Sequence, residues 1–199
     1  MSLSHKAIDV FRDHLASRGH KLSEIEWQRF CERLTPVSAA RGTVLLDSAR
    51  ITKHLFFVSD GVAASFQMSP DGDQQIARFF ERGHLCSNLT SAWHQQVSSD
   101  ALIAMSEFLG VRIPFSMFRE DFMTDAPLSA YWRGMVLETL VFDKDIICAK
   151  TVRDVETRYR FLVERYEHVV PLVPDKNIAR FLGITPQGLS RFKKNLRFS

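Results

Sequence analysis

Residues 175–194 constrain the fold of this chain more than any other stretch. Ile178 and Leu182 fall on one face of a predicted short helix. Gly183 follows them, and glycine accepts the left-handed backbone that ends a helix in a sharp turn. Thr185 then stands where a threonine hydroxyl can cap a second helix. The stretch therefore predicts two short helices joined by a tight turn, which is the pattern of a helix-turn-helix.

The second helix of this motif is predicted to bury Leu189 and Phe192 and to expose a polar face. In the DNA major groove, arginine pairs well with guanine and glutamine with adenine, whereas lysine and serine commonly bind phosphates. The predicted DNA-binding residues are Gln187, Ser190 and Arg191, which would face bases, and Thr185, Lys193 and Lys194, which would hold phosphates. The alternative is a surface helical hairpin whose basic face contacts only solvent.

The charge of the chain is unevenly distributed. Of the 26 lysines and arginines and 23 acidic residues, residues 150–199 carry eleven and five, and residues 1–149 carry the other 15 and 18. A basic C-terminal segment on a slightly acidic body is the layout expected of a nucleic-acid-binding protein with a second domain.

The chain before the motif alternates between helical and strand patterns. Residues 4–18 predict an amphipathic helix. A second helix is predicted from Ser23, where Glu26 completes a capping box, to Pro36. Short strands with turns between them are predicted at 43–46, 54–58, 62–67, 74–80, 101–105 and 108–113. Such regular short strands indicate an antiparallel barrel or jelly roll.

A short helix is predicted at 116–122, a long one from Pro127 to Lys150, and another over 152–169. The long helix carries two apolar stripes. The first stripe, Leu128, Trp132, Met135, Thr139, Phe142, Ile146 and Ala149, is predicted to pack on the roll. The second stripe, Val136, Leu140 and Ile147, needs a partner, which could be the same helix of another subunit. The alternative is that both stripes are buried within one chain.

Four stretches, taken in this order, resemble the Crp–Fnr family of bacterial transcription regulators. They are residues 41–46 and 55–61 in the predicted strands, residues 158–162 before the motif, and residues 178–191 within it. The resemblance covers almost the whole chain. It implies a homodimer that binds double-stranded DNA and acts with RNA polymerase. It also implies an N-terminal β-roll like that of cyclic-nucleotide-binding domains.

The patterns and the resemblance together predict an α+β fold. It would have an N-terminal antiparallel β-roll, jelly-roll-like, with flanking helices, then a long dimerisation helix and a C-terminal helix-turn-helix domain. The predicted domains are a sensor roll over 1–125, the dimerisation helix over 126–150, and the DNA-binding domain over 151–199.

The chain departs from the family at two places. The family's reader helix often carries Glu-x-x-Ser-Arg, where this chain has Gln187 followed by Ser190 and Arg191. Because glutamine favours adenine where glutamate accepts from cytosine, the preferred half-site should differ from the family's usual one. Cyclic-nucleotide-binding members carry Gly-Glu-Leu and then Arg-Ser/Thr, where this chain has 87–89 and then 98–99 without that glutamate or arginine. We therefore expect no tight binding of cyclic AMP.

A different effector is still possible in the roll. The residues predicted to line a pocket for an uncharged small molecule are Ser87, Asn88, Trp93, Ser98 and Ser99. The alternative is a roll that binds nothing and only builds the dimer.

Two other functions compete with DNA binding. A metal-dependent cupin-like enzyme would need clustered histidine and glutamate ligands, and the seven histidines form no such cluster in the sequence. A regulatory roll acting on a protein partner would bind without the steep salt dependence of phosphate contacts. We expect no catalytic activity, cofactor or metal. Without a long apolar run or a visible leader, we also expect a cytoplasmic protein that does not associate with membranes.

Overall fold

In the computed structural model, which describes residues 3–68 and 72–196, eight strands form two four-stranded antiparallel sheets. The strands are β1 (Thr35–Ala39), β2 (Val44–Leu46), β3 (His54–Asp60), β4 (Ala63–Met68), β5 (Gln74–Phe80), β6 (Leu85–Cys86), β7 (Ala101–Ala104) and β8 (Phe108–Pro114). One sheet has the order β1-β8-β3-β6 and the other the order β2-β7-β4-β5. These sheets and the helices around them confirm the predicted α+β class.

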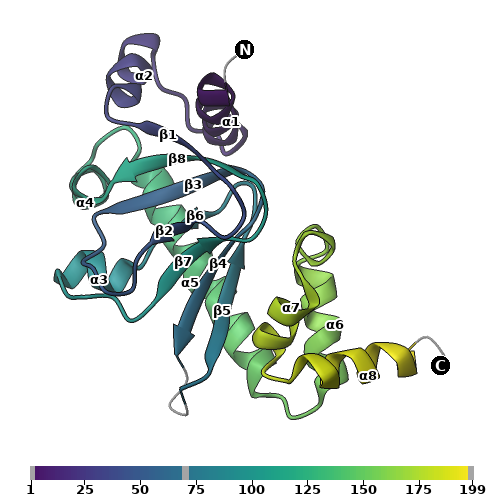
Figure 1. The fold of residues 1–199 in the computed structure, drawn as a ribbon. Coiled ribbons are helices and arrows are strands. Elements are labelled where there is room, and N and C mark those ends of the chain that lie inside the picture. Colours follow the sequence, from purple (N-terminus) through teal and green to yellow (C-terminus); the bar gives the residue numbers. More distant parts are fainter. Residues whose placement is uncertain (1–2, 69–71, 197–199) are drawn as a thin grey trace.

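Helices lie at both ends of this roll and along it (Figure 1). They are α1 (Leu3–Ser17), α2 (Glu24–Cys31), α3 (Leu89–His94), α4 (Phe115–Met123), α5 (Ser129–Thr151), α6 (Val155–Arg165), α7 (Asp175–Leu182) and α8 (Pro186–Leu196), with a 3₁₀ turn at Val170–Leu172. Helices α1 and α2 lie at one end of the molecule and α6, α7 and α8 at the other, and α5 runs between them (Figure 1).

The six predicted strands are confirmed, and their observed first and last residues differ from the predicted ones by at most two positions. The capping box of Ser23 and Glu26 also forms. The second helix was predicted to reach Pro36 but ends at Cys31, and Pro36 lies in β1. Proline is tolerated there because β1 is an edge strand of its sheet. The short elements β6 and α3 were not predicted, because two or six residues are too few to show a periodic pattern.

Helix α5 has one buried and one exposed apolar face. Its buried residues include Trp132 and Met135 in one apolar cluster and Phe142 and Ile146 in another. The large side chains on the exposed face are Leu137, Leu140, Val141 and Ile147, each 61–63% exposed. The predicted second stripe is therefore partly wrong, since Val136 is half-buried against the roll and the exposed face instead includes Leu137 and Val141.

The C-terminal helices pack on the roll through aromatic rings. The Phe79 ring of β5 stacks on Phe181 of α7 at 5.3 Å and meets the edge of Tyr166, just after α6, at 5.5 Å. Strand β5, α7 and the end of α6 thus share one apolar cluster, which also contains Leu189 of α8. Burial of these rings fixes the helix-turn-helix against the roll.

Gly61, between β3 and β4, should tolerate no side chain. Its φ is +81°, and an added Cβ would lie 2.0 Å from the Glu107 carbonyl oxygen. We expect Gly61→Ala to lower the free energy of unfolding by about 3 kcal/mol or more. Gly42 is the matched control, because its φ is +91° but an added Cβ would meet nothing within 4 Å. Gly42→Ala should cost only about 1–2 kcal/mol, the strain of the left-handed backbone alone. Denaturant unfolding of both variants measures the difference, and equal losses would contradict the expected clash.

Candidate nucleic-acid interface and ligand cavity

The turn between α7 and α8 has the geometry that the sequence predicted. Gly183 ends α7 with φ 67° and ψ 36°, in the left-handed region. The next amide, of Ile184, donates to the Ala179 carbonyl at 3.0 Å. Thr185 caps α8, since its Oγ1 accepts from the Gly188 amide at 3.0 Å. These contacts satisfy backbone groups at both helix ends and hold the two helices at a tight turn.

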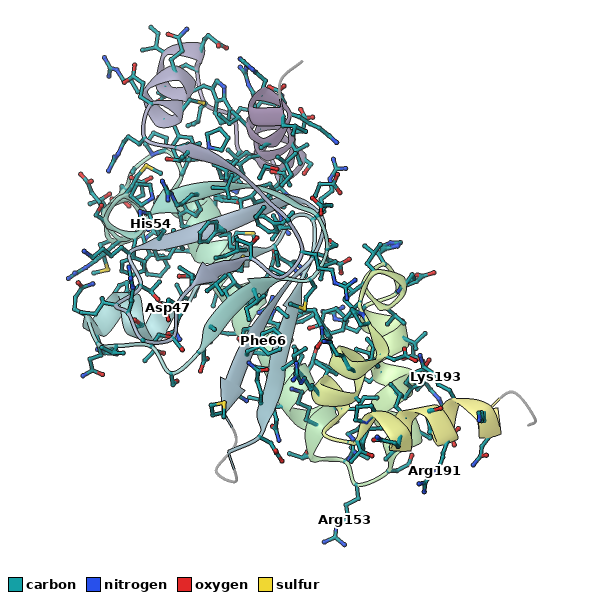
Figure 2. All side chains as sticks on the ribbon, in the orientation of Figure 1. Asp47, His54, Phe66, Arg153, Arg191 and Lys193 are labelled. Atoms are coloured by element: carbon teal, nitrogen blue, oxygen red, sulfur yellow. The ribbon has the colours of Figure 1, made fainter. Side chains whose placement is uncertain are left out.

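Helix α8 has a buried stripe and an exposed polar face. Leu189 is fully buried, and the Phe192 ring packs on the edge of Tyr159 in α6 at 5.3 Å. Five of the predicted DNA-binding residues are exposed, namely Thr185, Gln187, Ser190, Arg191 and Lys194. Figure 2 shows the Arg191 side chain pointing away from the roll. The structure therefore brings these five polar side chains to the surface at the cap and along one helix.

Lys193 differs from the other predicted DNA-binding residues. Its Nζ donates to Asp175 Oδ1 at 2.6 Å, and its side chain is only 29% exposed. This ion pair links α8 to the first turn of α7, so the structure gives Lys193 a partner within the motif. Its role as a phosphate ligand stays a prediction.

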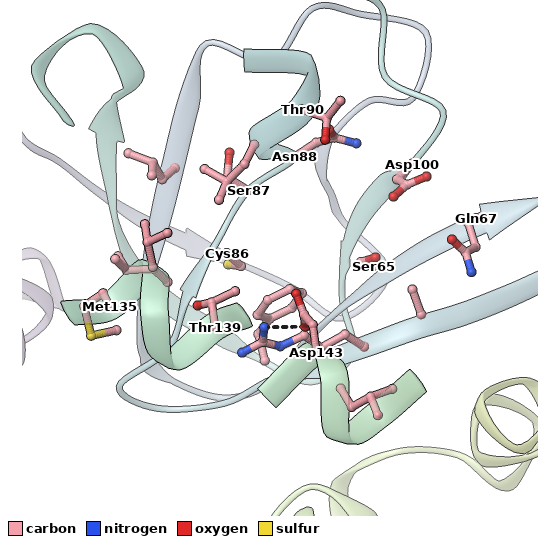
Figure 3. A pocket seen from close by; sticks show the side chains of 18 of the residues that line it. Ser65, Gln67, Cys86, Ser87, Asn88, Thr90, Asp100, Met135, Thr139 and Asp143 are labelled. Atoms are coloured by element: carbon pink, nitrogen blue, oxygen red, sulfur yellow. Dashed lines mark hydrogen bonds and ion pairs between the residues drawn. The ribbon is translucent and has the colours of Figure 1, made fainter. Parts of the chain in front are cut away.

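A cavity of about 510 Å³ lies between the roll and α5. Its walls come from β4, β5, β6, the start of α3 and one side of α5 (Figure 3). The polar and charged side chains in its lining are Ser65, Gln67, Arg78, Ser87, Asn88, Thr90, Asp100, Thr139, Asp143 and Lys150. Apolar groups such as Leu85 and Met135 complete the wall. A volume and a mixed lining of this kind suit a small-molecule ligand.

Only two of the predicted effector residues, Ser87 and Asn88, line this cavity. Trp93 does not, and its ring packs instead on Phe115 at 6.1 Å and on Phe122 at 6.2 Å. Ser98 is buried behind the wall, where its Oγ accepts from Asn88 Nδ2 at 2.6 Å. The exposed Ser99 bonds to the Asp100 carboxylate at 2.8 Å. The structure therefore does not bring Trp93, Ser98 and Ser99 into the wall of this cavity.

Sequence reasoning missed the charged residues of the cavity. Arg78 of β5 is buried, its Nη1 lies 2.8 Å from Asp143 Oδ1, and its guanidinium lies over the rings of Phe80 and Phe142 at 4.8 and 4.5 Å. A partial signal existed, since Arg78 stands two residues before Phe80 in β5, and this spacing puts both side chains on one face of the strand.

Lys150 is a second cation in the cavity wall. Its Nζ donates to the carbonyls of Ile76 at 2.6 Å and Ala77 at 3.0 Å. Burial of this ammonium lowers its pKa to about 8. The expectation of an uncharged effector did not take Arg78 or Lys150 into account.

No model of a known protein family matches the sequence, and no curated protein matches it. Solved structures do match. FixK2 from Bradyrhizobium japonicum has a TM-score of 0.69 at 17% identity, over 83% of this chain and 85% of that one. A protein of Eubacterium rectale assigned to the Crp/Fnr family of transcriptional regulators has a TM-score of 0.68 at 16% identity, over 92% and 86%. The chain has the Crp/Fnr fold. The c-di-GMP-responsive global regulator CLP from Xanthomonas campestris shares this fold, with a TM-score of 0.65 at 17% identity over 85% and 89%.

Two further observations concern the competing functions. Within residues 3–68 and 72–196, no three or more histidine, cysteine, aspartate or glutamate side chains gather so that they could hold a metal ion. Over the same described residues, no helix combines the length and the apolar character needed to cross a membrane.

The buried ammonium of Lys150 should make stability depend on pH. Its pKa falls from an ordinary 10.5 to about 8 in the folded chain. Between these values the unfolded chain binds more protons, so stability contributed by this residue rises with pH. We expect wild type to gain about 2 kcal/mol relative to Lys150→Met across this window. Denaturant unfolding of both proteins at a series of pH values measures it. Parallel curves would show that the ammonium is not buried as described.

Proposed function

We propose that this chain is a sequence-specific DNA-binding transcription regulator that acts as a homodimer. The observation that carries the proposal is the exposed polar face of α8 on a correctly capped helix-turn-helix. The Crp/Fnr fold supports the proposal, because CLP has the same architecture and is a global regulator. FixK2 also has this architecture. Contact with RNA polymerase follows as part of this role, and we propose no catalytic activity.

The proposed reader is the face formed by Gln187, Ser190, Arg191 and Lys194. A helix in the major groove presents such residues to base edges and phosphates. Arg191 would pair with guanine through its planar guanidinium, and Gln187 with adenine. Ser190 would lie beside them, while Thr185 and Lys194 would hold phosphates and set the position of the helix.

The proposed dimer interface is the exposed apolar face of α5. Leu137, Leu140, Val141 and Ile147 are each more than 60% exposed, which is a large uncovered apolar surface for one helix. A second copy of α5 packed alongside would cover this surface. Two copies would also place two α8 helices to read two half-sites of a palindrome. Under this proposal residues 1–125 form the sensor, 126–150 the dimerisation helix and 151–199 the DNA-binding domain.

Arg191→Ala should separate specific from non-specific DNA binding. Fragmented DNA of the source organism, selected with wild type, should yield a palindrome that Arg191→Ala fails to enrich. On that site, we expect Arg191→Ala to lose about 1–3 kcal/mol and to blur the sequence preference. Arg29→Ala is the charge-matched control, because Arg29 is exposed on α2 at the opposite end of the molecule from α8.

Lys194→Ala provides the contrast within the same experiment. It should weaken all sequences alike and reduce the salt slope of binding by about one, as expected for one lost phosphate contact. Equal losses for Arg191→Ala on specific and random DNA would contradict its role. No affinity for DNA, together with a salt-insensitive interaction with another protein, would point instead to a regulatory roll that acts on a protein partner.

Cys148 allows a direct test of the dimer. It is an exposed thiol on α5, two helical turns after Val141 and therefore on the same side of the helix. Mild oxidation should give a disulfide-linked dimer in wild type and in Cys31→Ser but not in Cys148→Ser. Leu140→Glu should place a charge in the interface, abolish the cross-link and shift the mass in solution to that of a monomer. A cross-link that survives Cys148→Ser, or a dimer unaffected by Leu140→Glu, would place the interface elsewhere.

A further inference from the structure

The ion pair at the base of the cavity is unequally buried. The Arg78 side chain is 8% exposed, whereas that of Asp143 is 46% exposed. If the pair opens, the carboxylate returns to water at little cost, but the guanidinium is left as a buried charge without a counter-ion. The arginine therefore depends on an anion, whereas Asp143 does not depend on the arginine.

Arg78 also has unused hydrogen-bonding capacity. A guanidinium carries five N–H donors. Among the described residues, the buried Arg78 Nε has no hydrogen-bond partner. The rings of Phe80 and Phe142 lie against the guanidinium, so a further acceptor has to approach in the guanidinium plane. Because Arg78 lines the cavity, that acceptor can come from a molecule bound within it.

We propose that the cavity binds a small organic anion whose carboxylate or phosphate replaces Asp143 on Arg78. Two acceptor oxygens can bond to a guanidinium side by side, which would also satisfy donors that Asp143 leaves unused. Lys150 supplies a second positive charge in the same wall. Ser87, Asn88 and Thr139 offer polar contacts to the rest of the molecule. The ligand is thus anionic, in contrast to the uncharged effector expected from the sequence, and its anchor lies in β5.

The exchange would change how α5 is held. Asp143 belongs to α5, and its bond to Arg78 is one link between this helix and β5. An anion that takes over Arg78 would release this link and so favour a different position of α5. That such a shift regulates DNA binding rests on the proposed function, but the binding of the anion does not.

Calorimetry on the full chain without DNA tests the proposal with three probes. Benzoate offers a carboxylate, phenyl phosphate a phosphate, and benzamide a neutral group of the same shape as benzoate. We expect at least one anion to bind at millimolar concentration and benzamide to bind at least about tenfold more weakly than that anion. The stronger of the two anions identifies which acid the site prefers.

Three substitutions separate an exchanged ion pair from a merely structural one. Asp143→Asn removes the competing carboxylate and should raise the affinity for the anion about tenfold. Asp100→Asn is the matched control, since it removes the same charge from the cavity wall without freeing Arg78, and it should change the affinity much less. Arg78→Gln should abolish binding.

The Asp143→Asn and Asp100→Asn pair decides the matter even if Arg78→Gln does not fold, because both variants keep Arg78. The proposal is overturned if no anion binds wild type or Asp143→Asn, or if benzamide binds as well as the stronger of the two anions. It is also overturned if Asp143→Asn leaves the affinity unchanged, or if Asp100→Asn raises it equally. Since no DNA is present, a chain that failed to bind DNA would still give the expected titrations.

Discussion

Helix α5 buries Trp132 and Met135 in one apolar cluster and Phe142 and Ile146 in another. The first cluster joins it to α1, α4 and the first sheet, and the second joins it to β4, β5 and the C-terminal helices. Removing this much apolar surface from water is the dominant favourable term that holds the two ends of the chain in one arrangement. The exposed face of the same helix, the wall of the cavity and the entry to α6 all depend on how α5 lies on the roll.

The packing of α5 also places charge where apolar groups would be expected. Between its buried side chains and the second sheet lies the cavity, and Arg78 reaches into it from β5. A buried guanidinium is tolerated only with a counter-ion, which is Asp143 from α5 itself. Helix α5 thus both encloses the cavity and supplies the carboxylate that neutralises Arg78. Under the proposal above, a ligand bound to Arg78 would therefore affect the position of α5 more directly than a ligand in a neutral cavity could.

The helix-turn-helix takes its orientation from the roll. Phe79 of β5 contacts Phe181 and Tyr166, so α7 rests on the strand that also carries Arg78. Helix α8 is held by α7 and by the contact between Tyr159 and Phe192, and its polar face is left exposed. A reader helix needs this combination of a rigid support and uncovered side chains, because base contacts require side chains held at defined positions.

The sequence by itself determined the class of fold, most of the strands and helices, and the whole helix-turn-helix. Gly183 and Thr185 act on backbone groups within one helical turn, so their effects hold whatever the rest of the fold is. Only the tertiary structure decided which residues line the cavity. Trp93 packs on Phe115 and does not line the cavity, whereas Arg78 lines it from β5. Cavity walls combine residues far apart in sequence, and their directions depend on strand register and on the position of α5, which no local pattern encodes.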